Sequence, residues 1–270
     1  MIPPAFTYVR ATSVDEALGL AAEHGEDAKF LAGGQSLLPL MKLRFASPTV
    51  LIDLGRVNEL SYVRDEGTYV AIGAMTRHHD VATSALLLRD VPLLAHTAQE
   101  VGDPQIRHRG TIGGSVAHAD PASDLPAVLL TLDATFVTRG VGSSREIPAS
   151  EFFQSLFETS LEPGELLAEI RVPKPSAPAK WAFEKFTQRA IDWAIVGVAV
   201  QGHSVGLVNM GSVPLRAVAV EGALAQGASP ADAAARAAEG TSAPADIRAS
   251  TAYREHLARV LVRRALEHAR

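Results

Sequence analysis

A proline-rich stretch, Pro173-Lys174-Pro175-Ser176-Ala177-Pro178, limits how this chain can fold more than any other feature. Proline fixes its own backbone angle and keeps the preceding residue out of the helical region, so such a stretch is typical of a stiff, extended linker. The chain has 270 residues, enough for one large domain or two modest ones. We therefore expect a first domain over residues 1–175 and a second over 176–270.

The first part of the chain mixes short helices with short strands. Ser13 and Glu16 match a capping box, which predicts a helix that ends at Gly25. The apolar residues 28–32 predict a buried strand that runs into a glycine pair. A second block begins near residue 57, so we expect subdomains over about 1–56 and 57–175. Further strands are expected at 49–53, 68–72, 134–138 and 166–172, with helices near 37–43 (broken at Pro39), 77–84, 91–101 and 124–130.

Beyond the linker the pattern changes. Residues 181–188, 194–201 and 204–210 predict a small antiparallel sheet, and Ala-rich helices follow. A long last helix is expected from about Ser250 to His268. Most of its apolar face would consist of Tyr253, Leu257, Val260, Leu261 and Leu266. The predicted fold class is therefore α+β.

The composition narrows the classes of function. An apolar fraction of 47% and a charged fraction of 20% are those of a soluble globular protein. A net charge of -5 argues against nucleic acid as a partner. No apolar run approaches the roughly 20 residues that span a bilayer, and the N-terminus lacks the features of a signal peptide. These observations predict a cytoplasmic protein without a transmembrane segment. Partner proteins could still hold such a protein at the inner face of the membrane.

The chain contains no cysteine. Disulfides, zinc–thiolate sites, iron–sulfur ligation and a cysteine nucleophile are therefore excluded on this chain. If the protein takes part in redox chemistry, its electrons must be carried by an organic cofactor. Any iron–sulfur cluster in the same enzyme must then be held by another polypeptide.

Two glycine pairs are the strongest candidates for a binding site. They lie in Ala32-Gly33-Gly34-Gln35-Ser36 and Thr111-Ile112-Gly113-Gly114-Ser115. Consecutive glycines let backbone N–H groups approach a pyrophosphate, and neighbouring hydroxyls add donors. A single pair is more often just a tight turn, but two similar pairs in one domain favour a dinucleotide site. The G-x-G-x-x-G and G-x-x-x-x-G-K-[ST] patterns are missing, so a Rossmann or P-loop architecture has little support.

Three charged residues close to the second pair have two interpretations each. Asp124 is placed to accept hydrogen bonds from ribose or ribityl hydroxyls, but either Ser123 or Asp124 would also serve as a helix cap. Arg107 and Arg109 would attract a pyrophosphate or would be surface charges. The residues alone leave these alternatives open.

Two other motifs favour structural explanations. Gly202-His203-Ser204-Val205-Gly206 matches the G-x-S-x-G elbow of hydrolases, but a strand pattern follows it where that motif requires a helix. A hairpin turn explains it better. His78-His79-Asp80 is interpreted as a solvated helix face, because the nine histidines show no metal-ligand spacing. We therefore predict no metal ligands and no catalytic side chain on this chain.

The quoted motifs resemble a known family. Residues 32–39, followed by Met41-Lys42-Leu43-Arg44, resemble the first FAD loop of the medium subunits of molybdenum hydroxylases. That family includes aerobic carbon monoxide dehydrogenase and the flavin domain of xanthine dehydrogenase. Residues 103–115, continuing into Asp120-Pro121-Ala122-Ser123-Asp124, resemble the second FAD loop, and residues 253–266 resemble the last helix. The resemblance spans nearly the whole chain.

The resemblance implies a vanillyl-alcohol-oxidase (PCMH) type FAD-binding domain and a small C-terminal domain with an antiparallel sheet and helices. It also implies a heteromeric enzyme, expected as (αβγ)2. An iron–sulfur small subunit would carry [2Fe–2S] clusters, and a large subunit would carry the molybdenum cofactor and the substrate. This chain would pass electrons through FAD to an external acceptor. Carbon monoxide, nicotine-like heterocycles, purines and aldehydes stay open as substrates, as do quinone, oxygen, a cytochrome and NAD as acceptors.

Carried over by motif, the resemblance assigns FAD-binding roles to specific residues. The two loops would contact the pyrophosphate, and Asp124 the ribityl or ribose hydroxyls. Lys185 would reach the isoalloxazine edge, and Leu167 would lie along the ring. Trp193 stands where relatives often have a tyrosine that shields one flavin face; without the family, a core aromatic would explain it. The predicted cofactor-binding residues are Ala32, Gly33, Gly34, Gln35, Ser36, Leu37, Val101, Thr111, Ile112, Gly113, Gly114, Ser115, Asp124, Leu167, Lys185 and Trp193.

Three other functions remain as alternatives. The first is a stand-alone FAD-dependent oxidoreductase that acts directly on a small substrate. The second is a hydrolase that uses Ser204. The third is a non-catalytic assembly protein that keeps the flavin fold without the flavin.

Overall fold

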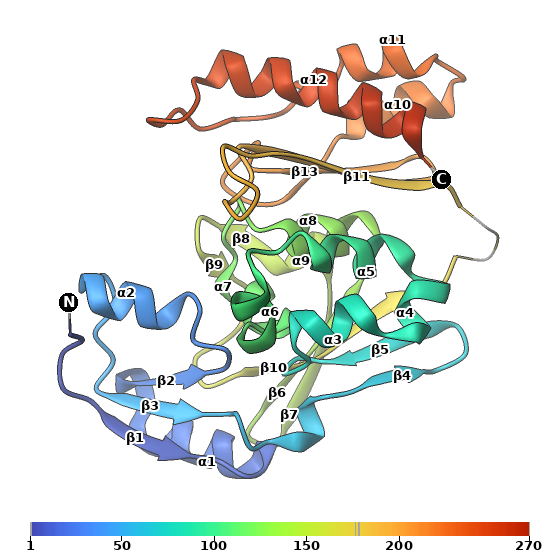
Figure 1. The fold of residues 1–270 in the computed structure, drawn as a ribbon. Helices are drawn as coiled ribbons and strands as arrows, with labels where there is room; N and C mark the ends of the chain where they lie inside the picture. The colour runs from blue at the N-terminus through green and yellow to red at the C-terminus, as the bar shows by residue number, and fades with distance from the viewer. Residues whose placement is uncertain (1, 176, 178, 270) are drawn as a thin grey trace.

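The computed structural model describes residues 2–175, 177 and 179–269 of the chain. Residues 176 and 178 of the expected linker lie outside the described residues. Three principal sheets and the helices around them confirm the predicted α+β class (Figure 1). No helix in the described part of the chain is long and apolar enough to cross a membrane.

A three-stranded parallel sheet forms the N-terminal part, in the order β1 (Thr7–Arg10), β3 (Val50–Asp53), β2 (Ala28–Leu31). Helix α1 (Val14–His24) buries Val14, Ala17, Leu18 and Ala21. Ser13 Oγ accepts from Glu16 N, as a capping box requires, and Glu16 Oε2 also accepts from Thr12 N at 2.7 Å. The 3-10 turns are η1 (Gly25–Asp27) and η2 (Asn58–Leu60).

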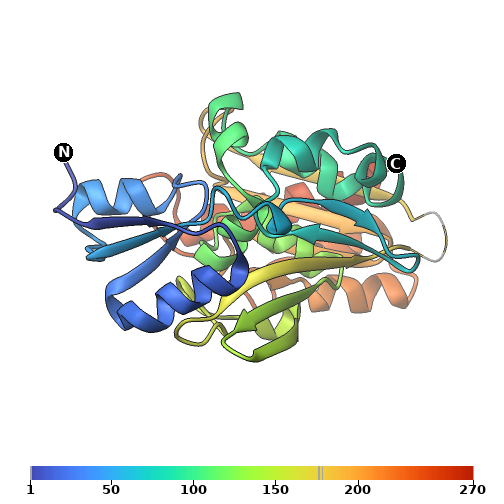
Figure 2. The ribbon, with the colours of Figure 1, turned by 90° about the horizontal axis from the view of Figure 1, so that it is seen from below.

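Helix α2 (Leu37–Leu43) follows β2 and runs through Pro39 without a break. The break expected at Pro39 does not occur, because proline in a first helical turn replaces an N–H that has no partner within the helix. Figure 2 shows this N-terminal part beside a second, larger sheet.

The second sheet has five strands in the order β4 (Val63–Asp65), β5 (Tyr69–Gly73), β10 (Leu166–Pro173), β6 (Thr135–Gly140), β7 (Ser143–Pro148). Its described pairs are antiparallel. Six helices connect β5 to β6: α3 (His78–Thr83), α4 (Ala85–Asp90), α5 (Pro92–Gln99), α6 (Pro104–Arg109), α7 (Ile112–His118) and α8 (Asp124–Thr131). After β7 come α9 (Ala149–Phe152) and the hairpin β8 (Phe153–Ser155) and β9 (Glu158–Thr159).

The C-terminal part is an antiparallel sheet in the order β11 (Trp181–Phe186), β12 (Val196–Gln201), β13 (Ser204–Val208), β14 (Leu215–Arg216). Helices α10 (Val218–Ala225), α11 (Pro230–Ala235) and α12 (Thr251–His268) cover its outer face (Figure 1). Helix α8 lies on the inner face, and every residue of α8 is buried. The contact is close: a Cβ on Gly206 would lie 2.8 Å from the carbonyl oxygen of Ala127.

The face of α12 differs from the prediction at its start. Tyr253 is 43% exposed, whereas Arg254 is 1% exposed. Arg254 is tolerated there because its guanidinium donates to Asp246 Oδ2 at 2.8 Å and to the carbonyl of Ile195. The spacing of apolar residues cannot predict that an arginine lies on the buried face, because its burial depends on hydrogen-bond partners elsewhere in the chain.

The motif around Ser204 is a hairpin, as predicted. Gln201 pairs with Ser204 across the two-residue turn, and Gly202 has a φ of 58°. Strand β13 follows rather than a helix, and Ser204 Oγ accepts from Arg216 Nη2 at 2.9 Å. The serine is therefore not set up as a nucleophile with a neighbouring base.

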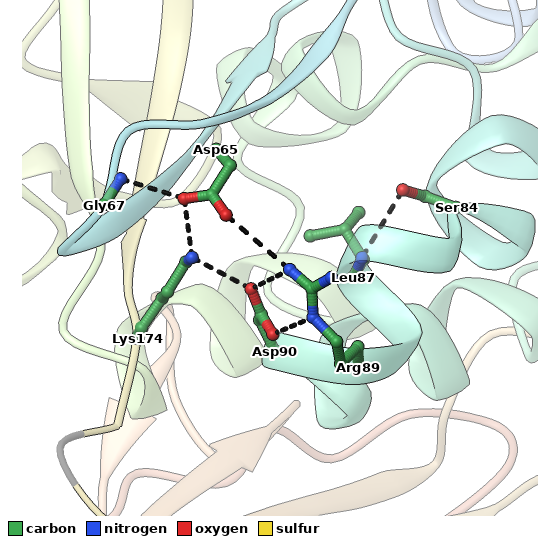
Figure 3. Close-up of polar contacts among 7 residues, drawn as sticks. All are labelled: Asp65, Gly67, Ser84, Leu87, Arg89, Asp90 and Lys174. Atoms are coloured by element: carbon green, nitrogen blue, oxygen red, sulfur yellow. Dashed lines mark hydrogen bonds and ion pairs between the residues drawn. The ribbon is translucent and has the colours of Figure 1, made fainter.

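An ion-pair cluster fixes the last residues before the second part of the chain (Figure 3). Lys174 Nζ lies 2.6 Å from Asp65 Oδ1 and 2.9 Å from Asp90 Oδ2. Asp90 also binds Arg89, whose Nε lies 2.6 Å from Asp90 Oδ1. The hydrogen bond from Lys174 lowers the pKa of Asp65. The cluster ties the end of β10 to β4 and α4.

Candidate cofactor site

The first glycine loop lies at the carboxyl edge of the parallel sheet, directly after β2. Gly34 has a φ of 75°, a left-handed conformation that favours glycine. Within the described residues, the backbone N–H groups of residues 33–36 donate to no protein acceptor. Such a row of free amides at the carboxyl ends of parallel strands is suited to binding an anionic group.

The second glycine pair is not a separate tight turn. It forms the first turn of α7, which follows α6 after only two residues. Its amides are already used: Gly113 N donates to Ala74 O at 2.9 Å, and Gly114 N donates to the N-cap oxygen of Thr111 at 3.1 Å. Ile112 N likewise bonds to Thr76 O. This loop can therefore present side-chain hydroxyls to a ligand, but the amides of residues 112–114 are not free to bind it.

The two loops touch each other. A Cβ on Gly33 would lie 2.4 Å from the carbonyl oxygen of Arg109 and 2.7 Å from Gly110 Cα. A Cβ on Gly114 would lie 3.6 Å from Ala32 Cβ and 2.8 Å from Thr111 Oγ1. Glycine at position 33 is therefore required for the loops to meet, independently of any ligand.

Asp124 and Lys185 form a buried ion pair next to the second loop. Lys185 Nζ lies 2.7 Å from Asp124 Oδ2, and the two side chains are 7% and 6% exposed. The other oxygen, Asp124 Oδ1, is buried and has no hydrogen-bond partner among the described residues. Burial raises the pKa of Asp124 to about 6, although the Lys185 ammonium acts in the opposite direction. An unpaired buried carboxylate oxygen is costly, and Oδ1 keeps an acceptor capacity that no donor among the described residues uses.

Further hydrogen bonds gather the predicted residues around this pair. Ser115 Oγ lies 2.7 Å from Ser123 Oγ, which links the second loop to the residue before Asp124. Lys185 Nζ also donates to the carbonyl of Glu100 at 3.1 Å, and Val101 is the residue that follows Glu100. Neither Ser123 nor Asp124 caps α8 with its side chain. Ser123 does occupy the N-cap position of α8, with an extended backbone, whereas Asp124 is the first residue of the helix.

Two predicted residues stand apart from this group. Leu167 is 4% exposed and packs in the core of the five-stranded sheet, so its side chain offers little surface to a ligand. Trp193 is 49% exposed in the loop between β11 and β12.

The last residues of the first glycine loop lead into α2. Gln35 is exposed, the side chain of Ser36 does not cap α2, and Leu37 is the first residue of that helix.

The basic residues near the second loop support the backbone. Arg107 donates to the carbonyls of Val101 and Gly102, both at 3.1 Å, so it is neither a free surface charge nor placed toward the glycines. Arg77 donates to the carbonyl of Arg109. No sequence pattern indicates this role of Arg77, because Arg77 and Arg109 are far apart in the chain.

His78 contradicts the prediction of a solvated helix face. It is 4% exposed, and a Cβ on Gly110 would lie 2.7 Å from its Cδ2. Burial lowers the pKa of His78 to about 4, and Arg107 and Arg77 act in the same direction. His78 is therefore a neutral residue under the second loop. No group of three or more His, Asp or Glu side chains in the described residues is arranged to hold a metal ion.

Two known families, each matching one part, together cover nearly the whole chain. The family described as the FAD binding domain in molybdopterin dehydrogenase matches residues 4–175. The family described as the CO dehydrogenase flavoprotein C-terminal domain matches residues 181–269.

Curated relatives match over similar lengths. The carbon monoxide dehydrogenase medium chain of Hydrogenophaga pseudoflava is 42% identical over 282 residues, which covers 100% of this chain and 98% of the relative. The glyceraldehyde dehydrogenase medium chain of Sulfolobus acidocaldarius is 38% identical over 280 residues, 99% of either chain.

Solved structures agree in fold. A carbon monoxide dehydrogenase from Hydrogenophaga pseudoflava, which lacks the Mo-pyranopterin moiety of the molybdenum cofactor, matches with a TM-score of 0.96 at 43% identity, covering 100% of this chain and 98% of that chain. Quinoline 2-oxidoreductase from Pseudomonas putida 86 matches with a TM-score of 0.93 at 31% identity, covering 100% and 98%.

Proposed function

This chain belongs to the family of FAD-binding medium subunits of molybdenum hydroxylases, and from that premise we propose that it is the electron-transfer subunit of such an enzyme. It would receive electrons from [2Fe–2S] clusters on a partner subunit and deliver them to an external acceptor. The absence of cysteine supports this division of labour, because this chain cannot ligate a cluster through thiolates.

The unpartnered Oδ1 of Asp124 carries the proposal; Asp124 follows Ser123, whose Oγ lies 2.7 Å from Ser115 Oγ of the second glycine loop. FAD has a pyrophosphate, which the free amides of residues 33–36 suit, and a ribityl chain whose hydroxyls would satisfy Asp124 Oδ1. The residues present therefore fit this cofactor. When bound, FAD supplies reversible redox chemistry to the chain.

Within the site, each residue has a limited role. Residues 32–37 and 111–115 would hold and orient the pyrophosphate. Lys185 keeps a positive charge next to Asp124 and would favour negative charge on the cofactor ring. Trp193 would shield one face of the ring, and Val101 and the backbone at Leu167 would line it. We propose no acid, base or nucleophile on this chain.

We propose that the partners are an iron–sulfur small subunit and a molybdenum-cofactor large subunit in an (αβγ)2 assembly. One relative is named as a subunit of a dehydrogenase complex, and one solved relative is a Cu,Mo-CO dehydrogenase, which supports a heteromeric enzyme. We also propose that residues 1–175 form the FAD-binding domain, with subdomains meeting near residue 56, and that 176–270 form the C-terminal domain. The assembly would reside in the cytoplasm.

The experiment separates the flavin-loaded chain from its partner subunits and offers each preparation carbon monoxide, nicotine, a purine and an aldehyde. We expect the flavin absorbance to bleach with one of these substrates in the holoenzyme and after the partners are added back. The chain alone should keep its colour. Direct bleaching of the isolated chain by a substrate would instead establish a stand-alone oxidoreductase.

A further inference from the structure

Asn209, the residue after β13, hydrogen-bonds to two segments that both carry predicted cofactor-binding residues. Its backbone N–H donates to the carbonyl of Pro121 at 2.8 Å. Its side-chain Nδ2 donates to the carbonyl of Ala194, also at 2.8 Å. Pro121 lies three residues before Asp124, and Ala194 follows Trp193. A single residue therefore connects the Asp124 segment to the loop that carries Trp193.

The backbone of Asn209 is in an uncommon conformation. Its φ of 61° lies in the left-handed region, which asparagine adopts more readily than most other residues with a side chain. Such a conformation costs energy and persists where the surrounding contacts fix it. The hydrogen bonds to Pro121 and Ala194 are contacts of this kind, because they hold the backbone and the side chain of the same residue.

Residues 187–195, which join β11 to β12 and which we call the Trp193 loop, are anchored next to the tryptophan. Ala194 is 2% exposed, whereas Trp193 is 49% exposed. Ala194 packs in a small apolar cluster with Ala127 of α8. Because α8 begins at Asp124, this packing adds a second link between the Trp193 loop and the Asp124 segment. The exposed indole therefore stands on a backbone that is fixed at the following residue.

We propose that Asn209 is a positioning residue, which holds Trp193 at the cofactor site through the carbonyl of Ala194. This inference rests on the proposed function, since it requires Trp193 to shield the flavin ring. A bond that ties the neighbouring residue removes conformational freedom from the tryptophan before the cofactor binds. Asn209 therefore acts on the exposure of the ring, and so on the approach of an external acceptor. FAD binding itself depends on the glycine loops and Asp124.

The test uses the full-length chain and two variants that remove the side-chain bond in different ways. Asn209→Gly tolerates the left-handed backbone and keeps the N–H bond to Pro121, but it has no side-chain donor. Asn209→Asp keeps the size of the side chain but places an ionised carboxylate, which cannot donate, against the carbonyl of Ala194. In the apo chain, amide hydrogen exchange of the Trp193 loop should be about tenfold faster in both variants, the factor expected from one hydrogen bond.

Flavin fluorescence per bound FAD is the second measurement. It should rise in both Asn209 variants, as in Trp193→Ala, while the FAD content stays that of the wild type. The double variant Asn209→Gly/Trp193→Ala should fluoresce no more than Trp193→Ala, because Asn209 acts through Trp193. Asp133→Gly is the matched control and should change neither measurement. Asp133 also has a left-handed backbone, with a φ of 51°, and its side chain accepts a hydrogen bond from Arg216 Nη1 at 2.8 Å.

Wild-type exchange rates in both Asn209 variants would overturn the inference, as would a double variant whose fluorescence is the sum of the two single effects. A change in Asn209→Gly alone would also overturn it, because lost volume rather than the lost hydrogen bond would then be the cause. Failure of the proposed function has a different signature: the wild-type chain would bind no FAD, or Trp193→Ala would leave the flavin fluorescence unchanged. The exchange rates of the apo chain would still decide whether Asn209 holds the Trp193 loop.

Discussion

Lys185 Nζ lies 2.7 Å from Asp124 Oδ2, and this buried ion pair joins the two parts of the chain on either side of the proline-rich stretch. Asp124 is the first residue of α8, and Lys185 lies in β11. The pair thus links the position of the C-terminal sheet to the residues that would bind FAD.

Removing one partner of the pair should be worse than removing both. Lys185→Met leaves a buried carboxylate without its counter-ion, a change that destabilises by about 3–5 kcal/mol. The double variant Asp124→Asn/Lys185→Met should lose less stability than the sum of the single variants. Urea unfolding of the apo chain measures this, with the exposed Lys180→Met as a neutral control. Additive losses would show that the pair is not coupled.

Gly33→Ala should separate the two glycine loops, because the added Cβ would lie 2.4 Å from the carbonyl oxygen of Arg109. We expect a loss of about 1–3 kcal/mol in stability and loss of bound FAD. Gly19→Ala is the matched control, since a Cβ there meets nothing within 4 Å. That control lies inside α1 and should stabilise the chain by up to about 1 kcal/mol. A Gly33→Ala protein with full FAD content and normal stability would refute the loop contact.

The sequence identified those features that depend on neighbours in the chain. The N-cap at Ser13, the hairpin at Gly202 and the end of α1 at Gly25 follow from local chemistry, and the structure has them. The α+β class, FAD and the medium-subunit family are also confirmed.

Contacts between distant segments could not be predicted in the same way. No pattern pairs Asp124 with Lys185, or Arg77 with the carbonyl of Arg109. The short helix α6 has Pro104 at its start and three basic residues at its end, which gives it no apolar periodicity. His78 is a polar residue buried by tertiary packing, and its sequence context resembles that of an exposed helix.

His78 should make the chain sensitive to acid. The pKa of His78 is lowered to about 4 in the folded state, so below the unfolded value of 6.5 the unfolded state binds the extra proton. Stability from this group is therefore present above pH 6.5 and is lost as the pH falls toward about 4, by roughly 1.4 kcal/mol per pH unit. Urea unfolding of wild type and His78→Gln across that range should show the steeper loss for the wild type. Parallel pH profiles would contradict the buried neutral histidine.

Trp193→Ala should expose the flavin ring without removing the cofactor. An aromatic stacking contact contributes about 0.5–1.5 kcal/mol, so FAD affinity should fall about 2- to 10-fold. Flavin fluorescence should rise, because a stacked indole quenches it. Ile191→Ala, which removes a neighbouring side chain that is 57% exposed, should change neither quantity. Equal fluorescence in wild type and Trp193→Ala would show that Trp193 does not shield the ring.

The flavin content of the purified full-length chain, determined from its visible absorbance after saturation with FAD, tests the FAD assignment directly. We predict close to one FAD per wild-type chain and much less in Asp124→Leu, which removes the acceptor oxygen that the protein leaves unpaired. A colourless wild-type chain that cannot be reconstituted with FAD would contradict the assignment of an FAD site to this chain, as would an Asp124→Leu variant that retains FAD in full.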